Sequence, residues 1–343
     1  MARSQAESWD PPTPGTKWLL RLPNWIGDAV MVLPALRSLP REEQDWTGVC
    51  HPRVRSLYHA SGLFDRLLDA AGGSAPIRLR TQLRALKPER AIVFTEAISG
   101  SVLAKFSGAP LRLGWERHPN RLLLTHARPG IDRSRSLWES YLELCEFAGG
   151  QKGELNFQLP IDKEDQAKAK VWLPKSKKAI GIVPGAAYGP AKQWPLDSFR
   201  SLIQALLTAG YPVVLLGGPG EVQVAEALDR DDVTNLVGKT SLTEMVACLA
   251  RCRAVVTHDS GGMHLARAAG TPMVALFGSS SPAWTGPGES EGAVLWQGLE
   301  CSPCFKRECP LPEPEKHMAC LKSISVDEVL SSLESVIKKK VRS

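Results

Sequence analysis

Short apolar runs alternate with turn residues and with stretches of helical periodicity along most of the chain. Lys17–Leu22 is predicted as a buried strand, and a turn at Pro23–Asp28 leads into apolar positions of helical spacing over Ala29–Leu39. Arg90–Phe94 is predicted as a further strand and Ser136–Ala148 as a helix. Strands that alternate with helices in this way indicate parallel sheets covered on both faces.

A second series of the same kind begins at Ala179. Its predicted strands are Ala179–Val183, Tyr211–Leu216, Ala254–Thr257 and Pro272–Phe277, and its predicted helices are Leu196–Ala209, Glu221–Leu228, Gly262–Ala269 and Ser325–Lys339. We therefore predict an α/β protein with two Rossmann-like domains that face a central cleft. Ligands of such sheets bind beyond the carboxyl ends of the strands.

Composition shifts divide the chain further. We expect a flexible tail at residues 1–16, an N-terminal domain at 17–160, a charged linker at 161–178, a C-terminal domain at 179–322, and a terminal helix and tail at 323–343. Residues 1–16 are polar and contain no signal-like apolar segment, and no run approaches the roughly 18 apolar residues of a spanning helix. These features predict a cytoplasmic protein whose membrane contact, if any, is peripheral.

The positive charge is concentrated in the first half of the chain. Between His51 and Leu137 there are 15 Lys and Arg residues against 6 Asp and Glu residues, whereas the whole chain carries only +6. Such a surplus attracts an anionic partner, for which nucleic acid, an acidic membrane surface and a phosphorylated lipid all qualify, although a solvated arginine-rich surface is an equal alternative.

Three loops at predicted strand ends carry residues suited to a nucleotide. Gly185, Ala186, Ala187, Tyr188 and Lys192 belong to a glycine-rich loop whose backbone N–H groups and cation suit a diphosphate. Glu221 begins a helix and can accept hydrogen bonds from ribose hydroxyls. Asp259, Ser260, Gly261, Gly262 and His264 lie where a strand gives way to a helix. Each feature has an ordinary alternative as well: a turn, a helix cap or a packed histidine.

Asp28 is the candidate reactive group of the first domain. It follows a strand-end turn at the start of a helix, where it could take a proton from an attacking hydroxyl or simply stabilise the helix end. The chain contains neither the dinucleotide fingerprint G-x-G-x-x-G followed by an acidic residue nor the P-loop G-x-x-x-x-G-K-[ST]. A nicotinamide dehydrogenase and a P-loop nucleotidase are therefore disfavoured.

Four of the eight cysteines lie close together in the sequence, and His317 is nearby. The spacing of Cys301, Cys304, Cys309 and Cys320 is similar to a zinc-ligand pattern but irregular for a zinc ribbon. A structural metal ion and unligated or redox-active thiols both remain open. The other four cysteines occur in apolar surroundings and are predicted to be buried.

Four segments together resemble the lipopolysaccharide heptosyltransferases of glycosyltransferase family 9. They are RLPNWIGDAVMVLPALRSL, VPGAAYGPAKQWP, LLGGPGE and VTHDSGGMHLARAAGTPMVALFGSSSP, and the resemblance extends from about Lys17 to Val336. NWIGD and GAAYGPAKQWP are most similar to the heptosyltransferase II branch, which adds the second heptose of the inner core in Gram-negative bacteria.

The resemblance implies a GT-B fold and an inverting transfer from ADP-L-glycero-D-manno-heptose to heptosyl-Kdo2-lipid A, with no cofactor. It makes Asp28 the general base, places Lys192 on the diphosphate and Glu221 on the ribose, and puts Asp259, Gly262 and His264 at the donor site. The basic first domain then favours a phosphorylated lipid acceptor over nucleic acid. Heptosyltransferase I, another family 9 enzyme, a GT-B-like nucleotide-sugar epimerase and a non-enzymatic nucleotide-sugar-binding protein are the alternatives.

Overall fold

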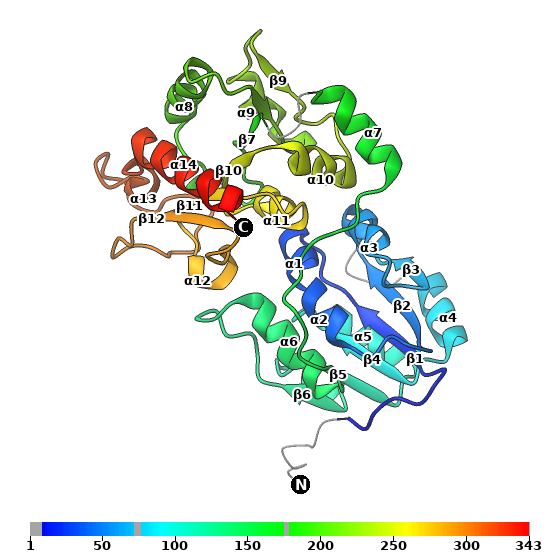
Figure 1. Cartoon of the computed structure of the whole chain (residues 1–343). Coiled ribbons are helices and arrows are strands. Elements are labelled where there is room, and N and C mark those ends of the chain that lie inside the picture. The colour runs from blue at the N-terminus through cyan, green and yellow to red at the C-terminus, as the bar shows by residue number, and fades with distance from the viewer. Residues whose placement is uncertain (1–8, 72–76, 175–177, 343) are drawn as a thin grey trace. The chain divides into compact units, whose positions relative to one another are not determined.

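The computed structural model describes residues 9–71, 77–174 and 178–342. The chain divides into two compact units between Phe157 and Gln158, and each unit is built around its own sheet (Figure 1). The predicted α/β class with two Rossmann-like domains is thereby confirmed.

The described part of the first unit contains a six-stranded parallel sheet in the order β3-β2-β1-β4-β5-β6. Its strands are β1 (Lys17–Arg21), β2 (Asp45–Cys50), β3 (Arg66–Asp69), β4 (Arg90–Val93), β5 (Leu111–Trp115) and β6 (His126–Arg128). Its helices are α1 (Ile26–Met31), α2 (Leu33–Ser38), α3 (Arg55–Ala60), α4 (Ile77–Leu86), α5 (Ile98–Ser107) and α6 (Leu137–Phe147), with short 3-10 turns at Pro52–Val54 and Asn120–Leu122.

Helices cover this sheet in two groups. α2 packs against α6, α1 contacts both of them, and α4 packs against α5 (Figure 1). Alternate strand residues such as Ala91 and Val93 join a core cluster with Leu83 and Leu103 of the α4–α5 group. This alternation arises because successive side chains of a strand point to opposite faces.

The predicted helix Ala29–Leu39 is two helices in the structure. α1 ends at Met31 and α2 begins at Leu33, with Val32 between them and Pro34 in the first turn of α2. Proline lacks an N–H group and its ring clashes with the preceding turn, but both properties are tolerated at a helix start. The proline therefore accounts for the break.

Part of the expected N-terminal tail is packed. Residues 1–8 lie outside the described part of the chain, but Trp9 is only 5% exposed and its ring contacts Trp18 and His126. The guanidinium of Arg90 lies over both tryptophan rings. The aromatic contacts explain why the chain is anchored from Trp9 onward.

The second unit repeats the first topology. Its described part has a six-stranded parallel sheet in the order β12-β11-β10-β7-β8-β9. The strands are β7 (Ile180–Val183), β8 (Val213–Leu215), β9 (Val233–Asn235), β10 (Ala254–His258), β11 (Met273–Phe277) and β12 (Gly292–Trp296). The helices are α7 (Lys163–Trp172), α8 (Leu196–Thr208), α9 (Val222–Glu226), α10 (Leu242–Arg251), α11 (Gly261–Ala268), α12 (Pro282–Thr285), α13 (Ala319–Lys322) and α14 (Val326–Arg342), with 3-10 turns at Pro190–Lys192 and Pro219–Glu221.

Two predicted segments take a different form. Residues 161–178, expected as a linker, contain α7, which is capped by Asp162 and packs against α10 within the second unit; residues 175–177 lie outside the described ranges. The terminal helix α14 is part of the second core, where Val329 and Leu333 are at most 2% exposed. Both helices belong to this unit because their apolar sides cover its sheet and helices.

Candidate functional site

The strand order of the second unit reverses between β7 and β10. The chain runs outward from β7 through β8 to β9 on one side and from β10 through β11 to β12 on the other. The loops that leave β7 and β10 therefore diverge at this position, which is where doubly wound sheets bind ligands. The loop at residues 184–195 and the start of α11 both lie here.

Lys192 and Asp259 join these two loops. The Lys192 ammonium forms an ion pair with Oδ2 of Asp259 and lies 3.3 Å from its carbonyl oxygen. Thr285 donates a hydrogen bond of 2.9 Å to the other carboxylate oxygen, Oδ1. Burial opposes ionisation of Asp259, but Lys192 and the other neighbouring polar groups together outweigh it, so the pKa of this carboxyl group lies below its usual range. An ammonium group is therefore held at the point where the strands diverge.

His258 is hydrogen-bonded to the end of the glycine-rich loop. It was not among the site residues predicted from the sequence. The side chain is fully buried, and its Nε2 accepts a hydrogen bond of 2.7 Å from the Trp194 backbone N–H. Burial lowers the pKa of His258 to about 4, so the ring is neutral near pH 7. The neighbouring Phe199 packs edge-on against the ring, with 5.3 Å between centroids.

Glu221, in the segment that follows β8, lies against the glycine-rich loop. Its Oε2 accepts a hydrogen bond of 2.7 Å from the Gly218 N–H. A Cβ at Gly185 or at Gly217 would overlap this carboxylate, so both positions need glycine unless Glu221 moves. Burial raises the pKa of Glu221, although the Gly218 bond acts in the opposite direction. The loop after β7 and the loop after β8 thus meet at the Glu221 carboxylate.

The start of α11 contains a polar side chain without a hydrogen-bond partner among the described residues. Ser260 is the N-cap residue but makes no capping bond with its side chain, and its buried Oγ has no partner among the described residues. Gly262 packs so closely that a Cβ would lie 2.5 Å from Val183. Open backbone N–H groups at a helix start suit an anionic group.

His264 is buried in the same first turn. Burial, followed by the charge of Arg267, lowers the pKa of His264 to about 3. A neutral imidazole can donate or accept a hydrogen bond but adds no positive charge. Any anion held here is therefore matched by Lys192 and backbone groups rather than by an imidazolium.

Asp28 occupies the corresponding place in the first unit, where the strand order reverses between β1 and β4. It lies half-buried in the first turn of α1. Burial raises the pKa of Tyr58 and Tyr141, and the charge of Asp28 raises both further. The carboxylate therefore lies near two buried phenol groups at the carboxyl edge of its sheet.

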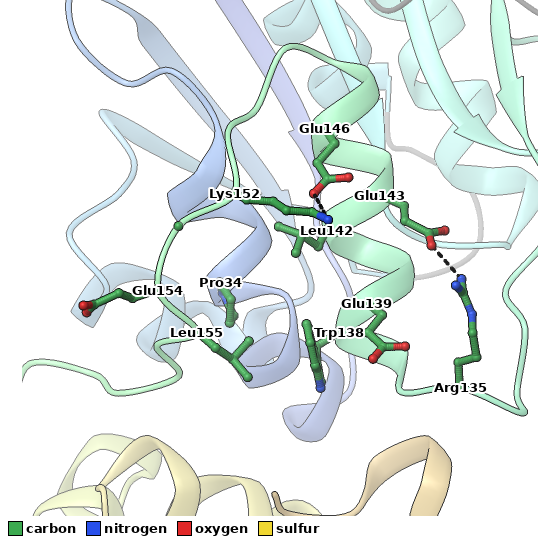
Figure 2. A pocket seen from close by; sticks show the side chains of 11 residues that line it. Pro34, Arg135, Trp138, Glu139, Leu142, Glu143, Glu146, Lys152, Glu154 and Leu155 are labelled. Carbon is green, nitrogen blue, oxygen red and sulfur yellow. Dashed lines mark ion pairs between the residues drawn. The ribbon is translucent and has the colours of Figure 1, made fainter.

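A separate hollow of about 500 Å³ in the first unit is lined by none of the predicted site residues (Figure 2). Its walls come from α2, α6 and residues 152–155, with Trp138 and Leu142 among its apolar lining. Ion pairs flank it, namely Glu143 with Arg135 at 2.8 Å and Glu146 with Lys152 at 3.9 Å (Figure 2). Its acidic lining does not suit an anionic ligand.

The four clustered cysteines carry free thiols and are at least partly exposed, whereas the other four are buried. Burial raises the pKa of Cys320, and the neighbouring Cys301, Cys304 and Cys309 raise it further. Within residues 9–71, 77–174 and 178–342, no group of three or more His, Cys, Asp or Glu side chains is arranged to hold a metal ion. Over the same residues, no helix is long and apolar enough to cross a membrane.

Comparison with known proteins gives consistent matches. Residues 77–314 match the model of glycosyltransferase family 9 (heptosyltransferase). Lipopolysaccharide heptosyltransferase 2 of Salmonella typhimurium is 30% identical over 301 residues, covering 80% of this chain and 86% of the relative. Lipooligosaccharide heptosyltransferase 2 of Haemophilus influenzae is 28% identical over 302 residues, with the same shares covered.

Solved structures agree with these matches. The structure of Escherichia coli ADP-heptose LPS heptosyltransferase II superimposes with a TM-score of 0.78 and 26% identity, covering 95% of this chain and 100% of that one. The predicted GT-B class is confirmed by this likeness. The family model matches most of the chain, and each unit has a six-stranded parallel sheet with the strand order of nucleotide-binding domains. This chain therefore belongs to glycosyltransferase family 9.

Proposed function

We propose that this protein transfers L-glycero-D-manno-heptose from ADP-heptose to heptosyl-Kdo2-lipid A, the step that adds the second heptose of the lipopolysaccharide inner core. The relatives named heptosyltransferase 2 support this assignment. The observation that carries it is the Lys192–Asp259 pair at the strand-order reversal of the second unit, beside the helix start where the Ser260 side chain makes no capping bond.

The second unit would bind the donor. Lys192 and the first-turn N–H groups of α11 would face the diphosphate, and Glu221 would accept hydrogen bonds from the ribose. Gly185, Ala186, Ala187 and Tyr188 would line the glycine-rich loop, and Ser260, Gly261, Gly262 and His264 the helix start. Preformed donors of this kind stabilise charge as it develops on a leaving group.

Asp28 would act as the general base. It would take the proton of the acceptor hydroxyl as that oxygen forms a bond to the anomeric carbon. The bond from the anomeric carbon to the diphosphate oxygen would break, and ADP would leave with the electron pair. Attack on the opposite face from the leaving group inverts the anomeric centre. Enzymes of this family need no cofactor for this transfer.

The first unit would bind the anionic acceptor. The arginine-rich stretch 51–137 supplies the charge, with the Arg53 guanidinium stacked 5.8 Å from the centre of the exposed Trp25 ring. Because the acceptor is a membrane lipid, we propose a cytoplasmic enzyme that contacts the inner membrane peripherally.

An acceptor-resolved assay tests the proposal. Purified protein is given ADP-heptose with heptosyl-Kdo2-lipid A, with Kdo2-lipid A, or with no acceptor, and ADP release and the mass of the lipid are measured. Transfer to the first acceptor alone supports the proposal. Transfer to Kdo2-lipid A alone indicates the enzyme that adds the first heptose. An altered sugar nucleotide without ADP release indicates an epimerase.

A further inference from the structure

The segment that carries the clustered cysteines packs directly on the glycine-rich loop. The Tyr188 hydroxyl donates a hydrogen bond of 2.8 Å to the carbonyl oxygen of Phe305. The Ala191 N–H donates to the Arg307 carbonyl at 3.0 Å, and the Arg307 Nε–H donates to the Tyr188 carbonyl at 2.9 Å. Three hydrogen bonds therefore tie two segments that are more than one hundred residues apart in the sequence.

Gly189 makes this close approach possible. Its φ is +153°, and a Cβ there would lie 2.5 Å from the Arg307 carbonyl oxygen. Both the conformation and the space favour glycine. The Phe305 N–H in turn donates to the Ser279 carbonyl at 2.6 Å, so the segment is also fixed to the loop that follows β11.

The contact brings a second cation to the Tyr188 ring, which Lys192 also approaches. The Lys192 ammonium lies 5.1 Å and the Arg307 guanidinium 5.5 Å from the centre of the Tyr188 ring. Lys192 has Asp259 as its carboxylate partner, whereas Arg307 is exposed and forms no ion pair with the described residues. Two cations with one buried carboxylate leave a local positive surplus, which an anion would neutralise.

We propose that Arg307 is a second cationic ligand of the donor diphosphate, positioned by the 301–309 segment; this inference rests on the proposed function. Arginine presents several N–H donors in a planar fork that matches phosphate oxygens, and one of them, Nε, is already used to hold the Tyr188 carbonyl. The terminal nitrogens are left for the ligand. The cysteine-bearing segment thus becomes part of the donor site.

This role can be tested by calorimetric titration with ADP, AMP and adenosine. The variants to compare with the parent protein are Arg307→Gln, Arg307→Lys and Lys306→Gln. We expect Arg307→Gln to weaken ADP binding about tenfold and to leave adenosine binding unchanged, because only the phosphates meet the guanidinium. Arg307→Lys should lie between Arg307→Gln and the parent protein. Lys306→Gln removes the same charge from the neighbouring position and should bind ADP normally.

The results separate this inference from the proposed function. Equal ADP affinity in Arg307→Gln and the parent protein would overturn the role of Arg307 while leaving the donor site intact. An equal loss for ADP and adenosine would also overturn it, because that pattern indicates a structural support only. A parent protein that binds no ADP would overturn the proposed donor and this inference together.

Discussion

The ammonium group of Lys192 forms an ion pair with the carboxylate of Asp259 and so connects the loop after β7 with the loop after β10. Asp259 is 5% exposed and Lys192 16% exposed, so the pair is largely shielded from water. Breaking a buried pair by removing one partner leaves the other charge uncompensated. We therefore expect stability and donor binding to be coupled at this position.

Replacing Lys192 should reveal that coupling. We expect Lys192→Met to weaken ADP binding at least tenfold and to lower the free energy of unfolding by about 3 kcal/mol. Urea denaturation and calorimetric titration measure the two effects. The double variant Lys192→Met/Asp259→Asn should recover part of the lost stability without recovering ADP binding. No recovery in the double variant would argue against an uncompensated Asp259 charge.

Asp28 should matter for transfer and not for donor binding. We expect Asp28→Asn to lower kcat by roughly 10²–10⁴-fold, because the amide cannot accept the hydroxyl proton. The affinity for ADP should stay within about twofold of the parent protein, since Asp28 lies in the other unit. Single-turnover transfer and equilibrium ADP binding provide the two readouts. Normal turnover in Asp28→Asn would remove this residue from the role of base.

Gly185 should be intolerant of a side chain. A Cβ at this position would overlap the Glu221 carboxylate, which the Gly218 N–H holds in place. We expect Gly185→Ala to displace Glu221 and to weaken ADP binding several-fold. Gly220→Ala is the matched control, because a Cβ there has nothing within 4 Å. Equal ADP affinity in the two variants would mean that Glu221 does not contact the ribose.

Acid should destabilise the protein before most carboxylates are protonated. Burial lowers the pKa of His258 to about 4 and that of His264 to about 3. Below about pH 6.5 the unfolded chain binds protons that the folded protein excludes, so the free energy of unfolding falls as the pH decreases. The loss through His258 continues to about pH 4, and that through His264 to about pH 3.

Denaturation curves from pH 7.5 to pH 4 check this prediction. For His258 alone the full loss should be roughly 3 kcal/mol. His258→Asn should be less stable than the parent protein at pH 7.5, because the ring no longer accepts the Trp194 N–H. Its stability should vary less with pH. The exposed His59 is the control for the substitution itself, and His59→Asn should have the same stability as the parent protein at pH 7.5.

Much of the fold could be read from local pattern. The apolar runs at residues 17–22, 90–94, 179–183 and 254–257 are buried strands because each is too short and too apolar for anything but the centre of a parallel sheet. The split of one predicted helix at Val32 was missed, although Pro34 was its visible cause. Strands such as β6 and β9 were not predicted, because their short segments carry little periodicity of their own.

The sequence by itself determined the strand-end loops and the residue types in them, because glycine, a capping position or a buried apolar run constrains the backbone over a few residues. Only the tertiary structure decided which of those loops meet. Three hydrogen bonds join positions far apart in the chain: the Trp194 N–H to the His258 ring, the Thr285 hydroxyl to the Asp259 carboxylate, and the Tyr188 hydroxyl to the Phe305 carbonyl. Such contacts depend on strand order and packing, and no local pattern encodes them.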